Sequence, residues 1–565
     1  MTALLPGGLL ALCVAGVLAA PVGVLPNDMV ARGRNGAVSS CEPHATRVGI
    51  EVLEAGGNAV DAAVAVALAL AVTHPQAGNL GGGGFLVIRM ADGRTAALDF
   101  RERAPASAKE DMYLRPDGSV DTDKVQYGAS AAGVPGSPAG LAHALAKFGT
   151  KPLRELAAPA IRFAREGIPV DQFLAASLAE AAPHLGRFEA TRKVFFRGDR
   201  PLQQGEPLVQ LDLAATLERY ADKGPEGFYT GRTAELVVAA MQQGGGFVTA
   251  QDLKDYVVAE REVLRGSYRG HEVVSMPPPS SGGVAVLQML NLLEPYDLRG
   301  MGFGSRRAIH LMTEAMRRAY ADRSKWLGDP DHHAVPVAGL VGKEYAAALR
   351  QGMRTDRVSE VAPGLPPGGK ESDDTTHFSV VDKEGNAVAC TTTINSTFGA
   401  MAVVEGAGFL LNNEMDDFSA KPGVPNQFGL VGGKANAIRP GKRMLSSMTP
   451  TIVLQDGKVR WVLGSPGGGR IINTVFQVLV NLVHHGMTLE RAVRAPRVHH
   501  QWLPDHLSWE ELSLSADVRA ALEAMGHRFA PKSMSIGRCQ AIAVEPDGTK
   551  VAVCDPRSGG SAGAH

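Results

Sequence analysis

The 565-residue chain lacks an excess of charge of either sign, since 57 lysines and arginines nearly balance 58 aspartates and glutamates. No run of lysine or arginine stands out along it. Nucleic acids and anionic membranes are bound through clustered positive charge, so neither is an expected partner. Hydrophobic residues make up 45% and charged residues 20% of the chain, which is close to the globular average and predicts a sizeable core.

Cysteine is scarce as well. The chain has five cysteines, and one of them, Cys13, lies in an apolar segment near the N-terminus. So few cysteines in so long a chain do not form a disulfide framework. Cys390 stands in a strand-like run and is expected to be buried and free.

Long hydrophobic runs are also missing. Residues 9–20 are apolar and end in small residues, which is typical of a secretion signal, although residues 1–8 contain no lysine or arginine. We therefore expect residues 1–20 to be a signal peptide and the protein to be periplasmic or extracellular. A second apolar stretch, residues 59–72, is rich in alanine and too short to span a membrane. It predicts a buried helix that ends near His74 and Pro75.

The pattern along the chain predicts an α/β protein. Residues 79–88 read as a glycine-rich entry into a strand, and residues 136–350 are mostly helical by their three-to-four apolar spacing. Residues 362–374 are rich in proline, glycine and acidic residues and predict an exposed loop. Two β-like runs follow, residues 375–381 and 387–394, joined by a strong turn signal, and a further strand is expected at residues 409–411. Strands flanked by helices fit a layered α/β sandwich.

Thr375 begins the first of those runs, directly after the predicted loop. A threonine hydroxyl is a poor nucleophile unless a base lies beside it, and the residue's own α-amino group is such a base once the chain is cut before it. A threonine pair in a strand usually reflects only β-propensity. However, a turn centred on residues 384–385 would place Thr375 opposite Thr393 or Ile394, with Asn395 on the same strand face as Thr393. A register shift of one residue would remove this arrangement.

Two further motifs suggest that charged groups of a ligand are bound. The loop at residues 464–470 leaves a strand and enters a helix, so its backbone N–H groups could hold an anion or oxyanion, or the loop could be only a tight turn. It lacks the ending of a phosphate-binding P-loop. Glu414 and Asp417 could both face a substrate ammonium group, and a solvated turn or a calcium-like site is the alternative.

Three weaker signals accompany them. Arg101 at a strand end could hold a carboxylate through two hydrogen bonds, although a surface ion pair is the more common role of such a residue. Ser446 and Ser447 offer hydroxyl groups at a strand entry. The pair His499-His500 suggests a metal, but adjacent side chains diverge on regular structure, so a structural role is favoured.

At these residues the sequence closely resembles the γ-glutamyltranspeptidase family of N-terminal nucleophile hydrolases. The matching blocks span nearly the whole chain after its N-terminal segment: residues 78–85, 99–103, 375–379, 391–398, 410–419, 421–433, 445–450, 464–470, 496–504 and 555–558. The resemblance implies a four-layer αββα sandwich and self-cleavage between Asp374 and Thr375. Residues 21–374 would form a large subunit and residues 375–565 a small catalytic one, associated in one intertwined unit.

The resemblance also implies the reaction. Thr375 would form a γ-glutamyl ester from glutathione or another γ-glutamyl compound, and water, an amino acid or a dipeptide would resolve it, with no cofactor and no metal. Thr393 would hydrogen-bond Thr375, and Gly467 and Gly468 would form the oxyanion hole. The remaining roles concern the substrate's α-groups: its carboxylate would be held by Arg101, Ser446 and Ser447, and its ammonium group by Asn395, Glu414 and Asp417.

Residues 425–430 resemble the family's lid loop, with one departure. Phe428 stands where many bacterial members have tyrosine, so a lid hydrogen bond is lost and looser gating is expected. An acylase on the same fold, removing a glutaryl-type side chain from a β-lactam, would leave Glu414 and Asp417 without a positive partner. A secreted binding protein without turnover would be free to lose Thr375 or the glycine loop, and both are intact.

Overall fold

The structure is a computed structural model and describes residues 28–362 and 375–565. Two seven-stranded antiparallel sheets lie at its centre. The first sheet has, in spatial order, β1 (Val30–Gly33), β19 (Lys550–Cys554), β18 (Gln540–Val544), β15 (Lys458–Gly464), β14 (Thr451–Gln455), β11 (His271–Ser275) and β10 (Leu264–Tyr268). The second has β20 (Ser561–Ala564), β2 (Ala37–Ser40), β12 (Thr376–Val381), β13 (Ala387–Thr393), β3 (Gly83–Arg89), β4 (Thr95–Asp99) and β9 (Ala259–Arg261).

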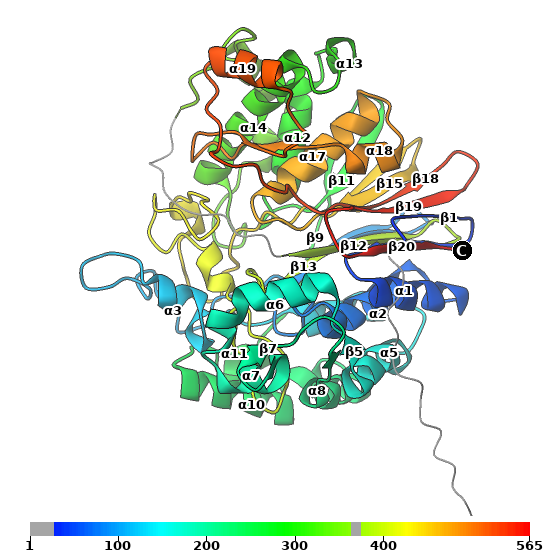
Figure 1. Cartoon of the computed structure of the whole chain (residues 1–565), viewed down its shortest axis with the longest axis vertical. Coiled ribbons are helices and arrows are strands. Elements are labelled where there is room, and N and C mark those ends of the chain that lie inside the picture. Colours follow the sequence, from blue (N-terminus) through cyan, green and yellow to red (C-terminus); the bar gives the residue numbers. More distant parts are fainter. Residues whose placement is uncertain (1–27, 363–374) are drawn as a thin grey trace, which may run out of the picture.

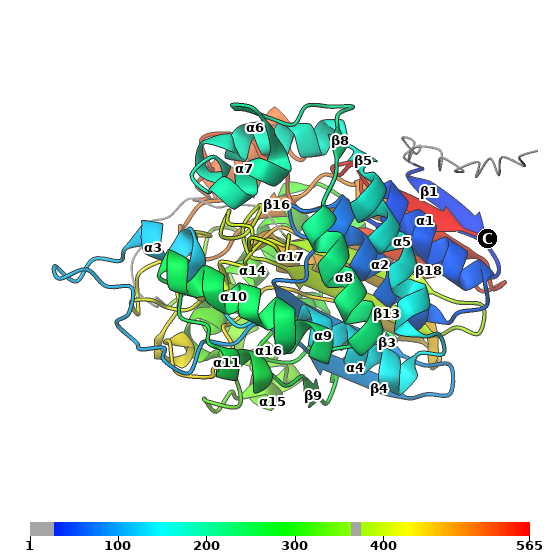
Figure 2. The same ribbon diagram turned by 90° about the horizontal axis from the view of Figure 1, so that it is seen from below.

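Helices cover the outer face of each sheet, which gives four layers (Figure 1). The first sheet carries α12 (Gly282–Leu293), α14 (Arg306–Trp326), α16 (Lys343–Gln351), α17 (Arg470–Val483), α18 (Leu489–Arg494) and α19 (Ala516–Ala524) on its side of the molecule. The second carries α1 (Pro43–Glu54), α2 (Ala59–Thr73), α4 (Ser137–Phe148), α5 (Leu153–Glu166), α8 (Leu211–Lys223) and α10 (Gly231–Gly244), several of which lie in front of the sheet in Figure 2. The predicted αββα sandwich is confirmed.

Each layer boundary is apolar. Phe85, Val274 and Ile452 belong to the core between the two sheets, and both outer helical layers have a larger core of their own. The helix α2 is buried along its whole length, as predicted, and begins with a capping box in which Asn58 and Asp61 bond each other's backbone N–H. Cys41, Cys390, Cys539 and Cys554 are all buried and free.

The predicted hairpin is confirmed in its register. β12 and β13 pair with Thr376 opposite Thr392, and one step further along places Thr375 opposite Thr393. Two other predictions differ from the structure. The mostly helical stretch, residues 136–350, contains β10 and β11, which complete the edge of the first sheet. Residues 409–411, expected as a strand, form only a single bridge at Leu410.

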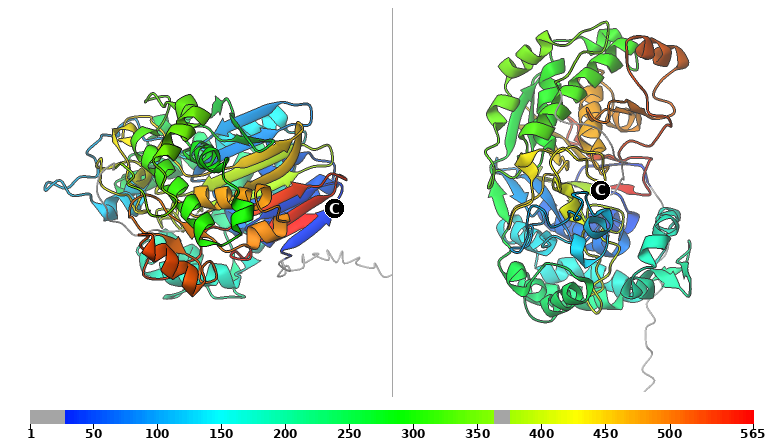
Figure 3. Two further views of the ribbon diagram at one scale, coloured as in Figure 1. Left: turned by 90° about the horizontal axis from the view of Figure 1, so that it is seen from above. Right: turned by 90° about the vertical axis from the view of Figure 1, so that its left-hand side faces the viewer.

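The two sides of Thr375 in the chain are interleaved in space. In the first sheet β1 pairs with β19 and β11 with β14, and in the second sheet β2 and β3 flank the hairpin of β12 and β13. The C-terminal strand β20 pairs with β2, so the end of the chain lies at the sheet edge beside the first strands (Figure 3). In the part of the chain that the structure describes, no helix is both long and apolar enough to cross a membrane.

Candidate active site

Thr375 lies at the mouth of the hairpin and is almost fully buried. Its hydroxyl donates to Thr393 Oγ1 over 3.4 Å, and the backbone N–H of Asn395 donates to the same oxygen over 2.8 Å. Thr393 thus links Thr375 to the strand that carries Asn395. The predicted proximity of these three residues is confirmed.

A glycine-rich segment holds this end of the hairpin in place. Asn79 Nδ2 donates to the backbone carbonyl of Thr393 over 2.9 Å, and its Oδ1 accepts from Gly82 N. A Cβ atom on Gly82 would lie 2.1 Å from the carbonyl oxygen of Thr393, so a larger residue cannot approach so closely there. Gly82, directly before β3, therefore allows the chain to pack closely enough to hold Thr393 in place.

One small cavity unites most of the predicted site. Its volume is about 20 Å³, which is room for roughly one water molecule. Its lining includes ten residues that the sequence predicts: Arg101, Thr375, Thr393, Asn395, Glu414, Asp417, Phe428, Ser446, Ser447 and Gly468. Gly467 is next in the chain but is not part of the lining, and Asp374 lies outside the described residues.

The glycine loop connects β15 to α17 and brings Gly468 to the cavity. Gly467 has φ of 132° and Gly468 has φ of 51°, and both values lie in the region that favours glycine. The carbonyl of Gly467 already accepts from Arg470 N, the first residue of α17. The loop therefore presents backbone to the cavity without a side chain in the way, as an oxyanion hole requires.

The charged residues of the site contact one another. The guanidinium of Arg101 is buried and forms ion pairs with Glu414 and with Asp417. Its Nε and Nη2 also donate to the carbonyl oxygens of Met444 and Leu445, at 3.4 Å and 3.5 Å, immediately before Ser446. From the sequence, Arg101 is expected to bind one charged group of the substrate, and Glu414 and Asp417 the other. In this structure the three side chains pair with one another.

Two further carboxylates, Glu102 and Asp416, stand in this cluster and were not found from the sequence. Glu102 is fully buried, its Oε2 is 3.6 Å from Arg101 Nη1, and neither of its carboxyl oxygens has a hydrogen-bond partner among the described residues. Burial raises the pKa of Glu102 to about 7 and that of Asp416 to about 7, and it raises the pKa of Glu414 well above its usual range. The attraction of Arg101 opposes burial at Glu102 and Glu414 but does not overcome it.

A second arginine, Arg323 of α14, also reaches the site. Its Nε donates to Ser281 Oγ over 2.9 Å and its Nη2 donates to Ser447 Oγ over 3.2 Å. Burial lowers the pKa of Arg323, and the nearby charge of Arg101 adds to this effect. No sequence motif marks Arg323, because it stands in an ordinary amphipathic helix and meets Ser447 only through the fold.

The lid-like segment closes the cavity. Phe428 is buried against the core of the first sheet's helical layer, and its carbonyl accepts from Gln501 Nε2 over 3.1 Å. Asn426 shapes the turn: its Oδ1 accepts from the N–H groups of Phe428 and Leu430, and its Nδ2 donates to Asp417 Oδ1 over 3.1 Å. The lid is thus bonded to a carboxylate of the site itself.

The adjacent histidines have structural partners, as predicted. His499 contacts Asn473 through Nδ1 and Gln501 through Nε2. The Nδ1 atom of His500 accepts from Trp502 N, and its Nε2 lies 3.3 Å from Asp505 Oδ1. The two rings therefore fix the segment that supports the lid.

Known proteins resemble the chain over nearly its full length. The sequence profile of Gamma-glutamyltranspeptidase matches residues 45–565. The glutathione hydrolase proenzyme of Escherichia coli (strain K12) is 50% identical over 93% of this chain and 91% of its own. A cephalosporin acylase structure from Bacillus halodurans superposes with a TM-score of 0.84 at 27% identity, over 98% of this chain and 99% of that one. The γ-glutamyltranspeptidase structure from Helicobacter pylori is 46% identical with a TM-score of 0.56, and covers 56% of this chain and 91% of that one. The chain belongs to the γ-glutamyltranspeptidase family of enzymes.

Proposed function

We propose that this enzyme cleaves the γ-amide bond of γ-glutamyl compounds such as glutathione, with Thr375 as the nucleophile. Before it can do so, it cleaves its own chain between Asp374 and Thr375. The observation that carries the proposal is the contact of Thr375 with Thr393 beside a single cavity that holds both signs of charge. The identity with a glutathione hydrolase proenzyme over 93% of the chain supports the same reaction.

Maturation would proceed by an acyl shift. The Thr375 hydroxyl attacks the carbonyl carbon of Asp374, the peptide C–N bond breaks, and an ester links the two residues. Water then cleaves this ester, which leaves a carboxylate on Asp374 and a free α-amino group on Thr375. Residues 21–374 and 375–565 become two subunits. The Helicobacter pylori structure supports this division, since 91% of that chain matches only 56% of this one.

Turnover would repeat this chemistry on a substrate. The α-amino group of Thr375 takes the hydroxyl proton as Oγ1 attacks the γ-carbonyl, and the N–H groups of Gly467 and Gly468 stabilise the oxyanion. The leaving amine departs with a proton and a γ-glutamyl ester remains. Water or an amine then resolves the ester, which gives glutamate or a new γ-glutamyl amide.

The charged cluster suits the glutamyl α-groups. Arg101, Ser446 and Ser447 would take the α-carboxylate, and Asn395, Glu414 and Asp417 the α-ammonium group. A zwitterion inserted between Arg101 and its two carboxylates replaces each ion pair with another, so the net charge of the site is unchanged. Because the closed cavity holds about one water molecule, the lid must move to admit a glutamyl group.

The acylase alternative fits this cluster less well. Glu414 and Asp417 both pair with Arg101 in the closed site. A glutaryl group would bring a carboxylate to Arg101 without an ammonium group, and it would leave these two carboxyl groups without a positive partner of their own. A γ-glutamyl group brings both charges.

We propose export to the periplasm or the medium, directed by residues 1–20, which lie outside the described residues. The interleaved sheets support a processed heterodimer whose subunits remain together.

The test compares purified wild-type protein with Thr375→Ala. Wild type should give two bands on a denaturing gel, with Thr375 at the N-terminus of the smaller band, and should release the chromophore from a γ-glutamyl anilide. Thr375→Ala should give one band and no release. Thr376→Val is the matched control, since Thr376 is the next hydroxyl in the strand and does not line the cavity. Release of chromophore by Thr375→Ala would refute the assignment of Thr375 as the nucleophile.

A further inference from the structure

Arg323 is a buried cation that the mechanism above does not use. It stands in the last turn of α14, behind the small cavity beside Thr375, which we call the glutamyl cavity. Arg323 is 5% exposed, and its guanidinium donates to two neutral hydroxyl groups, those of Ser281 and Ser447. Within residues 28–362 and 375–565, no carboxylate lies within ion-pair distance of it. A guanidinium buried in this way is costly until an anion approaches it.

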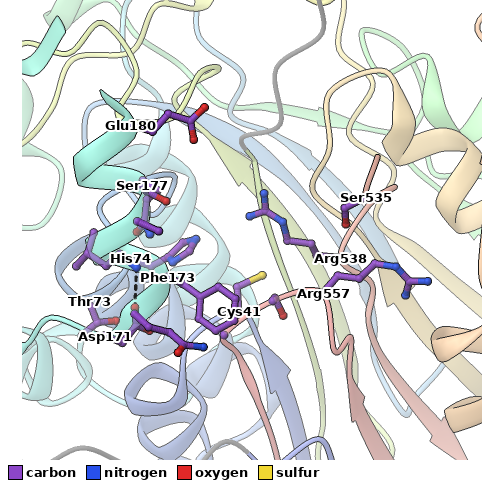
Figure 4. Close-up of a pocket in the computed structure, with 16 residues that line it drawn as sticks. Cys41, Thr73, His74, Asp171, Phe173, Ser177, Glu180, Ser535, Arg538 and Arg557 are labelled. Atoms are coloured by element: carbon purple, nitrogen blue, oxygen red, sulfur yellow. Dashed lines mark hydrogen bonds between the residues drawn. The ribbon is translucent and has the colours of Figure 1, made fainter. Parts of the chain in front are cut away.

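Other arginines beside cavities already have carboxylate partners. Arg557, in the wall of the cavity shown in Figure 4, pairs with Glu510 over 2.7 Å and with Asp555 over 2.9 Å. Arg101, on the opposite side of the glutamyl cavity's serines, pairs with two carboxylates of the site. Arg323 therefore adds a positive charge to the site that no described carboxylate pairs with.

Arg323 also fixes the direction in which a serine of the site donates. A guanidinium has only donors, so the hydroxyl of Ser447 must accept from it. The hydroxyl of Ser446 likewise accepts, from the backbone N–H of Met448 over 3.1 Å. Neither hydroxyl donates to a described residue, and both serines line the glutamyl cavity. Their O–H groups are therefore available to donate into the cavity, as binding of a carboxylate requires.

Ser281 ties Arg323 to the backbone of the same pair of serines. Its Oγ accepts from Arg323 Nε and donates to the carbonyl oxygen of Ser446 over 2.6 Å. Its backbone N–H donates to the same carbonyl over 2.7 Å. One guanidinium thus holds the hydroxyl of Ser447 directly and the backbone of Ser446 through Ser281. A planar group with donors in two directions can do this, and the single ammonium group of a lysine cannot reproduce it.

We infer that Arg323 is a positioning residue that makes the glutamyl cavity specific for donors with an α-carboxylate. The inference rests on the proposed function. Arg323 does not line the cavity and acts through Ser447, whose O–H it leaves free to bind the carboxylate. Its charge adds to that of Arg101, which is shared with Glu414 and Asp417.

Three donors that differ by one group each test this role. γ-Glutamyl anilide carries both α-groups, γ-aminobutyryl anilide lacks only the carboxylate, and glutaryl anilide lacks only the ammonium group. Arg323→Gln should raise the KM for γ-glutamyl anilide by about tenfold and change kcat by less than about threefold, since the contact with the carboxylate is the same in ground and transition states. The kcat/KM for glutaryl anilide should fall by about the same factor, and that for γ-aminobutyryl anilide by less than about twofold.

Two further variants complete the comparison. Arg323→Lys keeps the charge but not the planar fork, so it should lose less than Arg323→Gln and show the same preference among the donors. Lys325→Gln is the matched control, because Lys325 is an exposed cation two residues further along α14 and does not line the cavity. It should leave the values for all three donors within about twofold of wild type. Each protein is first checked for two bands on a denaturing gel, and Arg323→Lys carries the comparison if Arg323→Gln is not cleaved.

An equal loss of kcat/KM for all three donors in a cleaved Arg323 variant would show a merely structural role and overturn the inference. An unchanged KM for γ-glutamyl anilide would do the same. Equal kcat/KM values for γ-glutamyl and γ-aminobutyryl anilide in wild type would overturn it without any variant. Failure of the proposed function would look different, since wild type would then release no chromophore from γ-glutamyl anilide.

Discussion

Thr393 is the residue whose hydroxyl should matter most after that of Thr375. Its Oγ1 accepts from both Thr375 Oγ1 and Asn395 N, so its loss frees the nucleophile and leaves a buried N–H unpaired. Thr393→Val should slow both self-cleavage and anilide turnover by roughly 10- to 1,000-fold, which is the range for loss of one positioned polar group. Thr393→Ser keeps the oxygen and should stay within about tenfold of wild type. Equal rates in Thr393→Val and wild type would exclude this role.

Glu102 should make donor binding depend on pH. Because burial raises its pKa to about 7, Glu102 is protonated below that pH and ionised above it. Ionisation adds negative charge beside the place proposed for the substrate α-ammonium group, so the donor KM should fall as the pH rises from about 6 to about 8. Glu102→Gln cannot ionise and should flatten this dependence.

KM is the proper readout for Glu102, since the ordinary pKa of a free α-amino group is about 8 and protonation of the base at Thr375 would alter kcat. A donor KM that shows the same pH slope in Glu102→Gln as in wild type would contradict the assignment.

Site residues that lie close to one another along the chain could be predicted from the sequence. Thr375 and Thr393 could be paired because a hairpin with a strong turn fixes its register. Arg101, Glu414 and Asp417 could be singled out by their charge, and the resemblance to the γ-glutamyltranspeptidase family implied their roles. Arg323 and Asp416 carry no local signal. The direct pairing of Arg101 with Glu414 and Asp417 was also beyond the sequence, because it depends on how three loops meet.

The lid is the element whose stability should control access. Asn426→Ala removes two acceptor bonds that shape the turn and the bond to Asp417 Oδ1. The lid must open to admit a donor and should close again over the bound glutamyl group, so a less stable closed lid should let the donor leave more readily. The donor KM should therefore rise by about three- to tenfold while kcat changes less, since a net contribution of about 1 kcal/mol is typical of such hydrogen bonds. Asn426→Asp retains the turn acceptor and places a carboxylate against Asp417, so it should open the lid at least as much. An unchanged KM in both variants would show that the lid does not limit binding.

Most elements could be predicted from periodicity, and the exceptions have physical reasons. The helices α2, α5 and α14 show clear apolar patterns, and β12 and β13 show strand composition around a turn. The strand β10 contains Arg265 and Gly266 and resembles a loop, because it is the edge of its sheet. Residues 409–411 have strand composition, but apart from one bridge their bonds go to neighbouring turns.

At the scale of the whole molecule, the proposed subunits should be inseparable in buffer. Each central sheet contains strands from both sides of Thr375, so separation would break backbone ladders and expose the core between the sheets. Cleaved protein should therefore elute from a sizing column as one species that gives two bands on a denaturing gel. The two subunits should elute from the column as separate peaks only in a denaturant strong enough to unfold the protein. Two peaks in buffer would contradict the interleaved architecture.

The central claim is that Thr375 carries the γ-glutamyl group during turnover. The most direct measurement is mass spectrometry of the small subunit after acid quenching of a reaction with a γ-glutamyl anilide. The account predicts that this subunit gains the mass of one γ-glutamyl group, that fragmentation places it on Thr375, and that adding glycylglycine before the quench removes it. A γ-glutamyl group found on another residue, or steady chromophore release with no adduct even at the earliest quench of a first turnover, would contradict the account.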